Sequence, residues 1–199
     1  MRKTSESVEK AATLLSPPPV VSVMRMFSSL PPDMQTFARS YRYAAKALVR
    51  SIPEGQNNKG DVGCVPIIFL YRHALELYMK EILLTDGMPA STVLEERRHF
   101  LDRQVSDVAR VAKKLGVRLS KSTVDFINRA HISDPEGMLT RYPVTKKGEW
   151  SELQNLVRFE LKSFVEEAEG AVEELDGILQ EIQDGVYRET ERKILNGEL

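Results

Sequence analysis

The feature that most constrains this fold is a long heptad seam close to the C-terminus. Its apolar residues are separated alternately by three and four positions, which is the repeat of helices that pack side by side. The seam consists of Leu161, Phe164, Ala168, Ala171, Leu175, Ile178 and Ile182. We expect it to pack on another helix of the same chain, because a lone domain must first cover its own apolar faces. Pairing with a second subunit is the alternative.

The helix that carries the seam is expected to begin near Ser151. Trp150, the only tryptophan, precedes that start and is expected to anchor the bundle. Three glycines interrupt the seam helix, and each costs about 1 kcal/mol relative to alanine inside a helix. They are Gly170, Gly177 and Gly185.

Four earlier segments also carry helix signals. The sequence predicts helices over 34–52, 65–84, 102–115 and 120–130. Asp33 is placed to cap the first helix, Pro66 suits the first turn of the second, and Gly116 suits the end of the third. Residues 53–60 are typical of a polar loop, and 88–100 are ambiguous. Because strand signals are almost absent, the chain is predicted to be all-α, an antiparallel helical bundle with a long C-terminal helix.

A single domain is expected to hold most of the chain. The chain has 199 residues, of which 42% are hydrophobic, and this is enough to bury a core. A run of three prolines over 17–19 is expected to form a stiff extended connection. We therefore expect 1–30 to be an N-terminal extension, partly ordered or docked on a partner, and 31–199 to be one helical-bundle domain.

Composition and missing motifs exclude several functions. The net charge of -1 argues against tight, sequence-blind nucleic-acid binding by the whole surface, although a local basic patch stays open. A single cysteine, Cys64, excludes a disulfide framework. No apolar run reaches membrane-spanning length and no secretory signal is present, so a cytoplasmic protein without membrane contact is expected. The chain lacks phosphate-binding glycine loops, metalloprotease motifs and metal-ligand spacing, so neither a metal nor a cofactor is predicted.

A narrow polar stripe crosses the helix predicted over 65–84. On a helical wheel its four residues fall within an arc of about 100°, at spacings of three and four that allow contact. They are Arg72, His73, Glu76 and Lys80. The stripe is either the solvent face of an amphipathic helix or a polar seam facing a cleft, in which Glu76 orients a neighbouring histidine or arginine. Its narrowness favours the cleft.

All three histidines, His73, His99 and His131, lie next to an arginine or one residue further from it. Histidine exchanges protons near neutral pH, and arginine holds phosphate through a bidentate fork. Together these residue types would suit a metal-independent ribonuclease, in which a 2′-hydroxyl is deprotonated and the charge on phosphorus is neutralised. Three such neighbours could equally arise by chance.

Three segments resemble those of a group of uncharacterised bacterial helical proteins. Residues 69–80 resemble their RHxxELxLK helix, 98–101 their GHxL segment, and 134–143 their DpxgxxfRYP turn. We associate this group with the HEPN-like helical-bundle superfamily. The resemblance implies a HEPN-like fold and a link to RNA, because many members are ribonucleases of toxin, abortive-infection or defence systems. Others are non-catalytic modules of nucleotide-transfer or RNA-handling complexes.

One departure from the superfamily pattern bears on catalysis. Catalytic HEPN domains carry an arginine followed by a histidine after four to six intervening residues, and no histidine here has an arginine at that spacing. The resemblance then implies a module that binds RNA, a nucleotide or a protein partner in a bacterial stress or defence setting, with a homodimer as one version. The alternatives are a metal-independent ribonuclease with a different site, and a structural protein that pairs through the C-terminal seam.

A ribonuclease would need residues from three parts of the chain to converge. Its catalytic set would be Arg72, His73, Glu76, His99 and Arg141, with Lys80 and Tyr142 binding substrate. The structural alternative is that Asp134 caps its own turn, Arg141 pairs with Glu76, and Tyr142 packs under the bundle.

Overall fold

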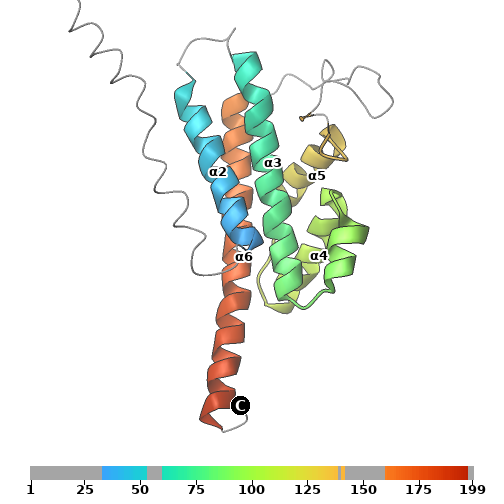
Figure 1. The fold of residues 1–199 in the computed structure, drawn as a ribbon, viewed down its shortest axis with the longest axis vertical. Helices are drawn as coiled ribbons and strands as arrows, with labels where there is room; N and C mark the ends of the chain where they lie inside the picture. The colour runs from blue at the N-terminus through green and yellow to red at the C-terminus, as the bar shows by residue number, and fades with distance from the viewer. Residues whose placement is uncertain (1–32, 53–59, 139, 142–159, 197–199) are drawn as a thin grey trace, which may run out of the picture. The chain divides into compact units, whose positions relative to one another are not determined.

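The fold is described by a computed structural model over residues 33–52, 60–138, 140–141 and 160–196. Every regular element in these ranges is helical (Figure 1). The elements are α2 (Met34–Ser51), α3 (Gly60–Thr85), η3 (Thr92–Arg97), α4 (Leu101–Lys114), α5 (Lys121–Ser133) and α6 (Leu161–Leu195). None of these helices is both long and apolar enough to cross a lipid bilayer. The predicted all-α chain with a long C-terminal helix is therefore confirmed for the described residues.

Local side chains and glycines set several helix ends, as the sequence predicts. The Asp33 carboxylate accepts a hydrogen bond from the backbone N–H of Thr36 at 2.6 Å and caps α2. The chain leaves α3 and α4 through Gly87 and Gly116, whose φ angles of 91° and 74° suit glycine.

The start of α3 differs from the prediction. The helix begins at Gly60, five residues before the predicted start, and Pro66 lies inside it rather than in its first turn. Proline lacks the N–H that would bond to the carbonyl four residues earlier, so it removes one hydrogen bond from an early turn. The long apolar run that follows packs in the core, and this packing holds the helix despite that loss.

Other boundaries also differ. The ambiguous stretch 88–100 contains η3, a short helix with the wide π geometry, and α5 continues to Ser133 instead of ending near 130. The last helix begins at Leu161 after an extended Glu160, ten residues later than the predicted start near Ser151. The predicted extension over 1–30, most of the loop at 53–60, Tyr142 and Trp150 lie outside the described residues.

Three long helices, α2, α3 and α6, form the centre of the fold; α4 packs on α3, and α5 packs on α4 and α6 (Figure 1). Gln35 near the start of α2 bonds to Asp176 at 3.2 Å, and Lys46 near its end pairs with Glu169 at 2.8 Å. In contrast, Tyr71 in the middle of α3 bonds to Glu169 at 2.9 Å, and Tyr78 further along α3 interacts with Asp176 further along α6. Thus α2 runs antiparallel to α6, whereas α3 and α6 run in the same direction, so the described helices are not antiparallel throughout.

The heptad seam packs within the chain. Five seam residues are buried where α6 meets α3 and α5, while Leu161 and Phe164 are half-buried. The five are Ala168, Ala171, Leu175, Ile178 and Ile182. The predicted intrachain packing is therefore confirmed. It holds α3, the helix that carries the polar stripe, against α6.

Glu169 links α6 to α2 and α3. Its carboxylate accepts hydrogen bonds from Arg42 at 2.6 Å, Lys46 at 2.8 Å and Tyr71 at 2.9 Å. Burial opposes ionisation of this group, but the three donors outweigh it and lower the pKa of Glu169 to about 2. Because α2 is held to α6 in this way, its position beside α3 is fixed.

Candidate functional site

Arg72 is a buried arginine that joins α3 to two turns distant in sequence. Its Nε donates to the Asp134 carbonyl at 3.2 Å, Nη1 to Glu76 Oε2 at 3.2 Å, and Nη2 to the His99 carbonyl at 2.9 Å. Burial lowers the pKa of Arg72, although Glu76 and Asp134 partly offset this effect. Because both turns bond to one guanidinium, the segments around His99 and Asp134 are held beside α3.

Glu76 lies at the centre of the site and is 1% exposed. Its Oε1 accepts a hydrogen bond from Lys80 Nζ at 2.7 Å and lies 2.9 Å from His99 Nδ1, while Oε2 pairs with Arg72. Burial opposes the charge, but Lys80, His99 and Arg72 together lower the pKa of Glu76. The carboxylate is therefore ionised at neutral pH, and Lys80, predicted to bind substrate, is itself buried and donates to Glu76.

His99 presents one ring nitrogen outward. Its side chain is 45% exposed, and no described residue bonds to Nε2. A carboxylate at Nδ1 favours the tautomer that carries its proton there, which leaves the Nε2 lone pair available to accept a proton. Glu76 thus orients the His99 imidazole at the surface, where the ring can transfer protons or contact a phosphate.

The turn after α5 forms the third side of the site. The Asp134 carboxylate accepts hydrogen bonds from Met138 N at 2.8 Å and Thr140 Oγ1 at 2.9 Å, which confirms the predicted capping of its own turn. Arg141 is exposed, and its Nε donates to the Gly137 carbonyl at 2.6 Å. The predicted pair of Arg141 with Glu76 is replaced among the described contacts of Glu76 by Arg72, Lys80 and His99.

His73 lies beside this cluster, but its ring belongs to an aromatic group. It stacks on Phe69 with ring centroids 5.6 Å apart and an angle of 9°, and it meets Tyr41 edge-on at 4.5 Å. Burial lowers the pKa of His73, and Lys80, Arg141 and Arg72 lower it further, against the effect of Glu76. Arg141 is therefore close enough to influence His73 and Arg72. Tyr41 and Phe69 are the site neighbours that sequence reasoning missed, since their helical spacing looks like ordinary core packing.

Of the predicted residues, Arg72, Glu76, Lys80 and His99 are in direct contact, and Arg141 and His73 border them. The histidine of the third pair, His131, lies apart from the cluster, with Nε2 3.3 Å from Asp102 on α4. Tyr142 lies outside the described residues. Direct contacts thus join four of the seven predicted residues, and electrostatic interactions link Arg141 and His73 to them.

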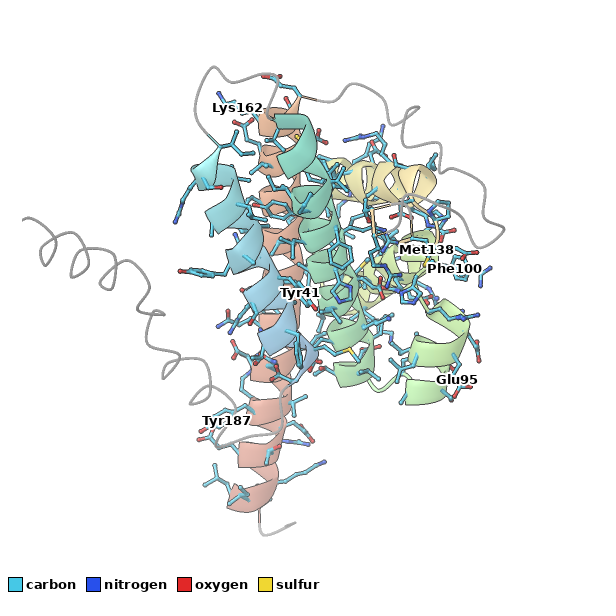
Figure 2. The ribbon with its side chains drawn as sticks, turned by 45° about the horizontal axis from the view of Figure 1, so that its top comes forward. Tyr41, Glu95, Phe100, Met138, Lys162 and Tyr187 are labelled. Atoms are coloured by element: carbon cyan, nitrogen blue, oxygen red, sulfur yellow. The ribbon has the colours of Figure 1, made fainter. Side chains whose placement is uncertain are left out.

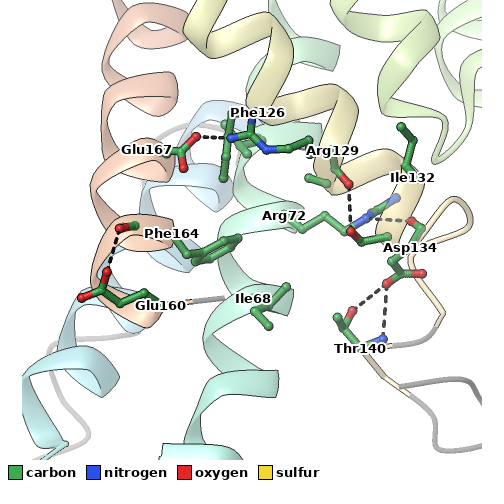
Figure 3. A pocket seen from close by; sticks show the side chains of 14 residues that line it. Ile68, Arg72, Phe126, Arg129, Ile132, Asp134, Thr140, Glu160, Phe164 and Glu167 are labelled. Atoms are coloured by element: carbon green, nitrogen blue, oxygen red, sulfur yellow. Dashed lines mark hydrogen bonds and ion pairs between the residues drawn. The ribbon is translucent and has the colours of Figure 1, made fainter. Parts of the chain in front are cut away.

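A cavity of about 410 Å³ lies on the other side of Arg72, between α3, α5 and α6 (Figure 3). Its wall is mainly apolar and includes Ile68, Phe126 and Phe164. Polar groups at its edge bond to one another, as in the pairs of Arg129 with Glu167 and of Thr140 with Asp134. No sequence signal indicates this cavity, because its walls come from three separate helices.

The described residues contain no group of three or more His, Cys, Asp or Glu side chains placed to hold a metal ion. No family model, curated protein or solved structure matches the chain. The function is therefore argued from the site itself.

Proposed function

We propose that this chain is a HEPN-like helical module that binds RNA at the site around Glu76. The observation that carries the proposal is the buried Glu76 carboxylate, which lies 2.9 Å from the half-exposed His99, while the exposed Arg141 lies in the turn that Arg72 also contacts. The exposed Arg141 brings a guanidinium close to the buried cluster of Arg72, Lys80 and Glu76. An exposed guanidinium and an outward imidazole are groups that suit a phosphate of the RNA backbone.

The missing arginine–histidine spacing favours binding over cleavage in this proposal. Arg72 supports the same choice, because three of its donors already bond within the protein and its guanidinium is buried. Its role is then to position His99 and the 134–141 turn. The resemblance also implies a bacterial stress or defence setting. It leaves a nucleotide or a protein partner as alternatives to RNA.

The second candidate function is metal-independent RNA cleavage, and the Glu76–His99 pair is the observation that favours it. His99 Nε2 would take the proton of a 2′-hydroxyl, whose oxygen would form a bond to the adjacent phosphorus. The bond from phosphorus to the 5′-oxygen would break, and that oxygen would take a proton from water. The products would be a 2′,3′-cyclic phosphate and a 5′-hydroxyl.

Fluorescence anisotropy with a labelled, unstructured RNA of about 12 nucleotides tests binding, since single-strand sites span about 4–16 nucleotides. We expect Arg141→Ala to weaken binding roughly 5-fold, the effect of losing one hydrogen bond worth about 1 kcal/mol. Arg188→Ala is the matched control, because it removes the same charge from an exposed position near the far end of α6. Equal losses in the two variants would refute the site, and no binding by the wild type would refute the function.

The same RNA, incubated with protein in EDTA and run on a denaturing gel, tests cleavage. Cleavage by the wild type that is lost in His99→Ala, with binding retained, would support the second candidate. Intact RNA in every lane would remove the cleavage candidate and leave the binding proposal standing.

A further inference from the structure

The junction of α2 and α3 carries a partly exposed aromatic group next to the Glu76 site. Tyr41 comes from α2, and Phe69 and His73 come from successive turns of α3; Figure 2 labels Tyr41 at this junction. All three side chains are half-buried, and Phe37 on the same face of α2 is 41% exposed. The rings therefore remain within reach of a ligand at the surface.

This aromatic group borders the cations of the site. His73 interacts electrostatically with Lys80, Arg141 and Arg72, as well as with Glu76. Sites for single-stranded nucleic acid combine these two elements, cations that follow the backbone and rings on which successive bases stack. Resting on the RNA-binding function proposed above, we infer that Tyr41, Phe69 and His73 stack an unpaired base, so that the site takes single-stranded RNA in preference to duplex.

A second exposed tyrosine lies on the other face of α2. Tyr43 is 74% exposed, and it lies two positions from Tyr41, so the two side chains leave the helix on nearly opposite sides. Tyr43 is therefore directed away from the Glu76 site and is expected to take no part in this stacking. Because Tyr41 and Tyr43 lie two positions apart, Tyr43 supplies a matched control.

Base pairing determines whether an RNA can use the aromatic group, so the site should distinguish single-stranded RNA from duplex RNA. In a duplex the faces of the bases are stacked on one another, and only the backbone and the groove edges are accessible. A duplex can then reach Arg141 and His99 but not the aromatic rings. A single strand can reach both, and it can do so with little sequence preference, because every base has a face to stack.

The test measures the affinity of a labelled RNA of about 12 nucleotides, single-stranded or annealed to its complement, at one fixed salt concentration. We expect the wild type to prefer the single strand roughly 10-fold, and Tyr41→Leu to lose roughly 10-fold in single-strand affinity without change for the duplex. Tyr41→Phe keeps the ring and should behave as the wild type, and Tyr43→Leu should have no effect. The wild-type preference needs no variant, so it tests the inference even if Tyr41→Leu fails to fold.

Each contrary result has a distinct meaning. If the wild type binds single strand and duplex equally, the stacking inference is overturned while the proposed RNA binding stands. If the wild type binds neither, both fall. Sedimentation of the same variants covers a protein partner: an oligomer that dissociates in Tyr41→Leu, with RNA affinity unchanged, would show that the aromatic group joins two copies, and the inference would be overturned.

Discussion

At the scale of single residues, the guanidinium of Arg72 contacts three parts of the chain: Glu76 on its own helix, and the carbonyls of His99 and Asp134. One of these three contacts, that with Glu76, could be predicted from the sequence. Arg72, Glu76 and Lys80 are four residues apart on a helix, and such pairs meet wherever the helix forms. The bonds to backbone carbonyls could not be predicted, because a carbonyl carries no signature in the sequence.

Gly137 lies against this guanidinium, and its replacement tests how tightly Arg72 is held. A Cβ at Gly137 would lie 2.7 Å from Arg72 Nη1, and the residue has a φ of 65°. Gly116 is the matched control, because it has a φ of 74° but open space around its Cβ position. We expect Gly116→Ala to destabilise by about 1–2 kcal/mol through the backbone alone. Gly137→Ala should lose more in urea unfolding; equal losses would show that Arg72 moves aside without cost.

The protonation of His73 predicts a dependence of stability on pH. Burial and the nearby cations lower its pKa below the usual 6.5, so the folded state favours the neutral ring. Below that pH the unfolded state binds more protons, and stability falls as pH decreases from 6.5 towards the folded pKa. We expect His73→Phe, which retains a ring for stacking, to show a smaller loss of unfolding free energy between about pH 7.5 and pH 5.5 than the wild type. An unchanged loss in the variant would assign that dependence to other groups.

At the scale of elements, local chemistry explains what the sequence predicts well. Capping by Asp33 and the positive φ of Gly116 depend on neighbouring residues, and both predicted ends are confirmed. The start of α3 and the wide turn of η3 depend on tertiary packing. This packing outweighs the preference of a proline such as Pro66 for the first turn of a helix. The cavity beside Arg72 and the aromatic contact of Tyr41 could not be predicted for the same reason, since each joins different helices.

The glycines of α6 give a prediction about helix stability. Gly170 and Gly177 are exposed, and a Cβ at either position would meet nothing within 4 Å. Alanine should therefore gain helix propensity without a clash, and each substitution should stabilise by about 0.5–1 kcal/mol in thermal or urea unfolding. A destabilising result at either position would indicate that another surface approaches α6 there.

Glu169 gives a prediction about how α2 is held. Glu169→Gln keeps the shape of the side chain but removes the charge that Arg42 and Lys46 contact. Hydrogen bonds to charged groups contribute about 1.5–3 kcal/mol, and we expect a loss of that order in urea unfolding at neutral pH.

Acid titration separates this charge effect from a packing defect. The pKa of Glu169 lies below its usual 4.5, at about 2, so its contribution is complete above pH 4.5 and is lost as pH falls towards 2. The stability of the wild type and the variant should therefore converge over that range. A constant difference at every pH would contradict the assigned role of the charge.

At the scale of the whole molecule, α3 contributes residues both to the apolar cavity and to the Glu76 site. One side of Arg72 faces the apolar cavity, and the other holds Glu76 and His99 in place. The heptad seam of α6 packs on α3, and the carboxylate of Glu169 keeps α2 beside it. The site therefore depends on contacts between helices distant in sequence, and it should be lost cooperatively when the fold unfolds.

The central claim is that RNA binds at the Glu76 site, and mapping of backbone amide shifts tests it most directly. Single-stranded RNA would be titrated into the uniformly ¹⁵N-labelled chain, and the shifted amides would be assigned. We expect the largest changes at residues 97–100 and 134–141, with smaller changes around Tyr41 and His73. Shifts concentrated on the face formed by α2 and α6, around Arg39 and Tyr43, would contradict the claim, as would an unchanged spectrum.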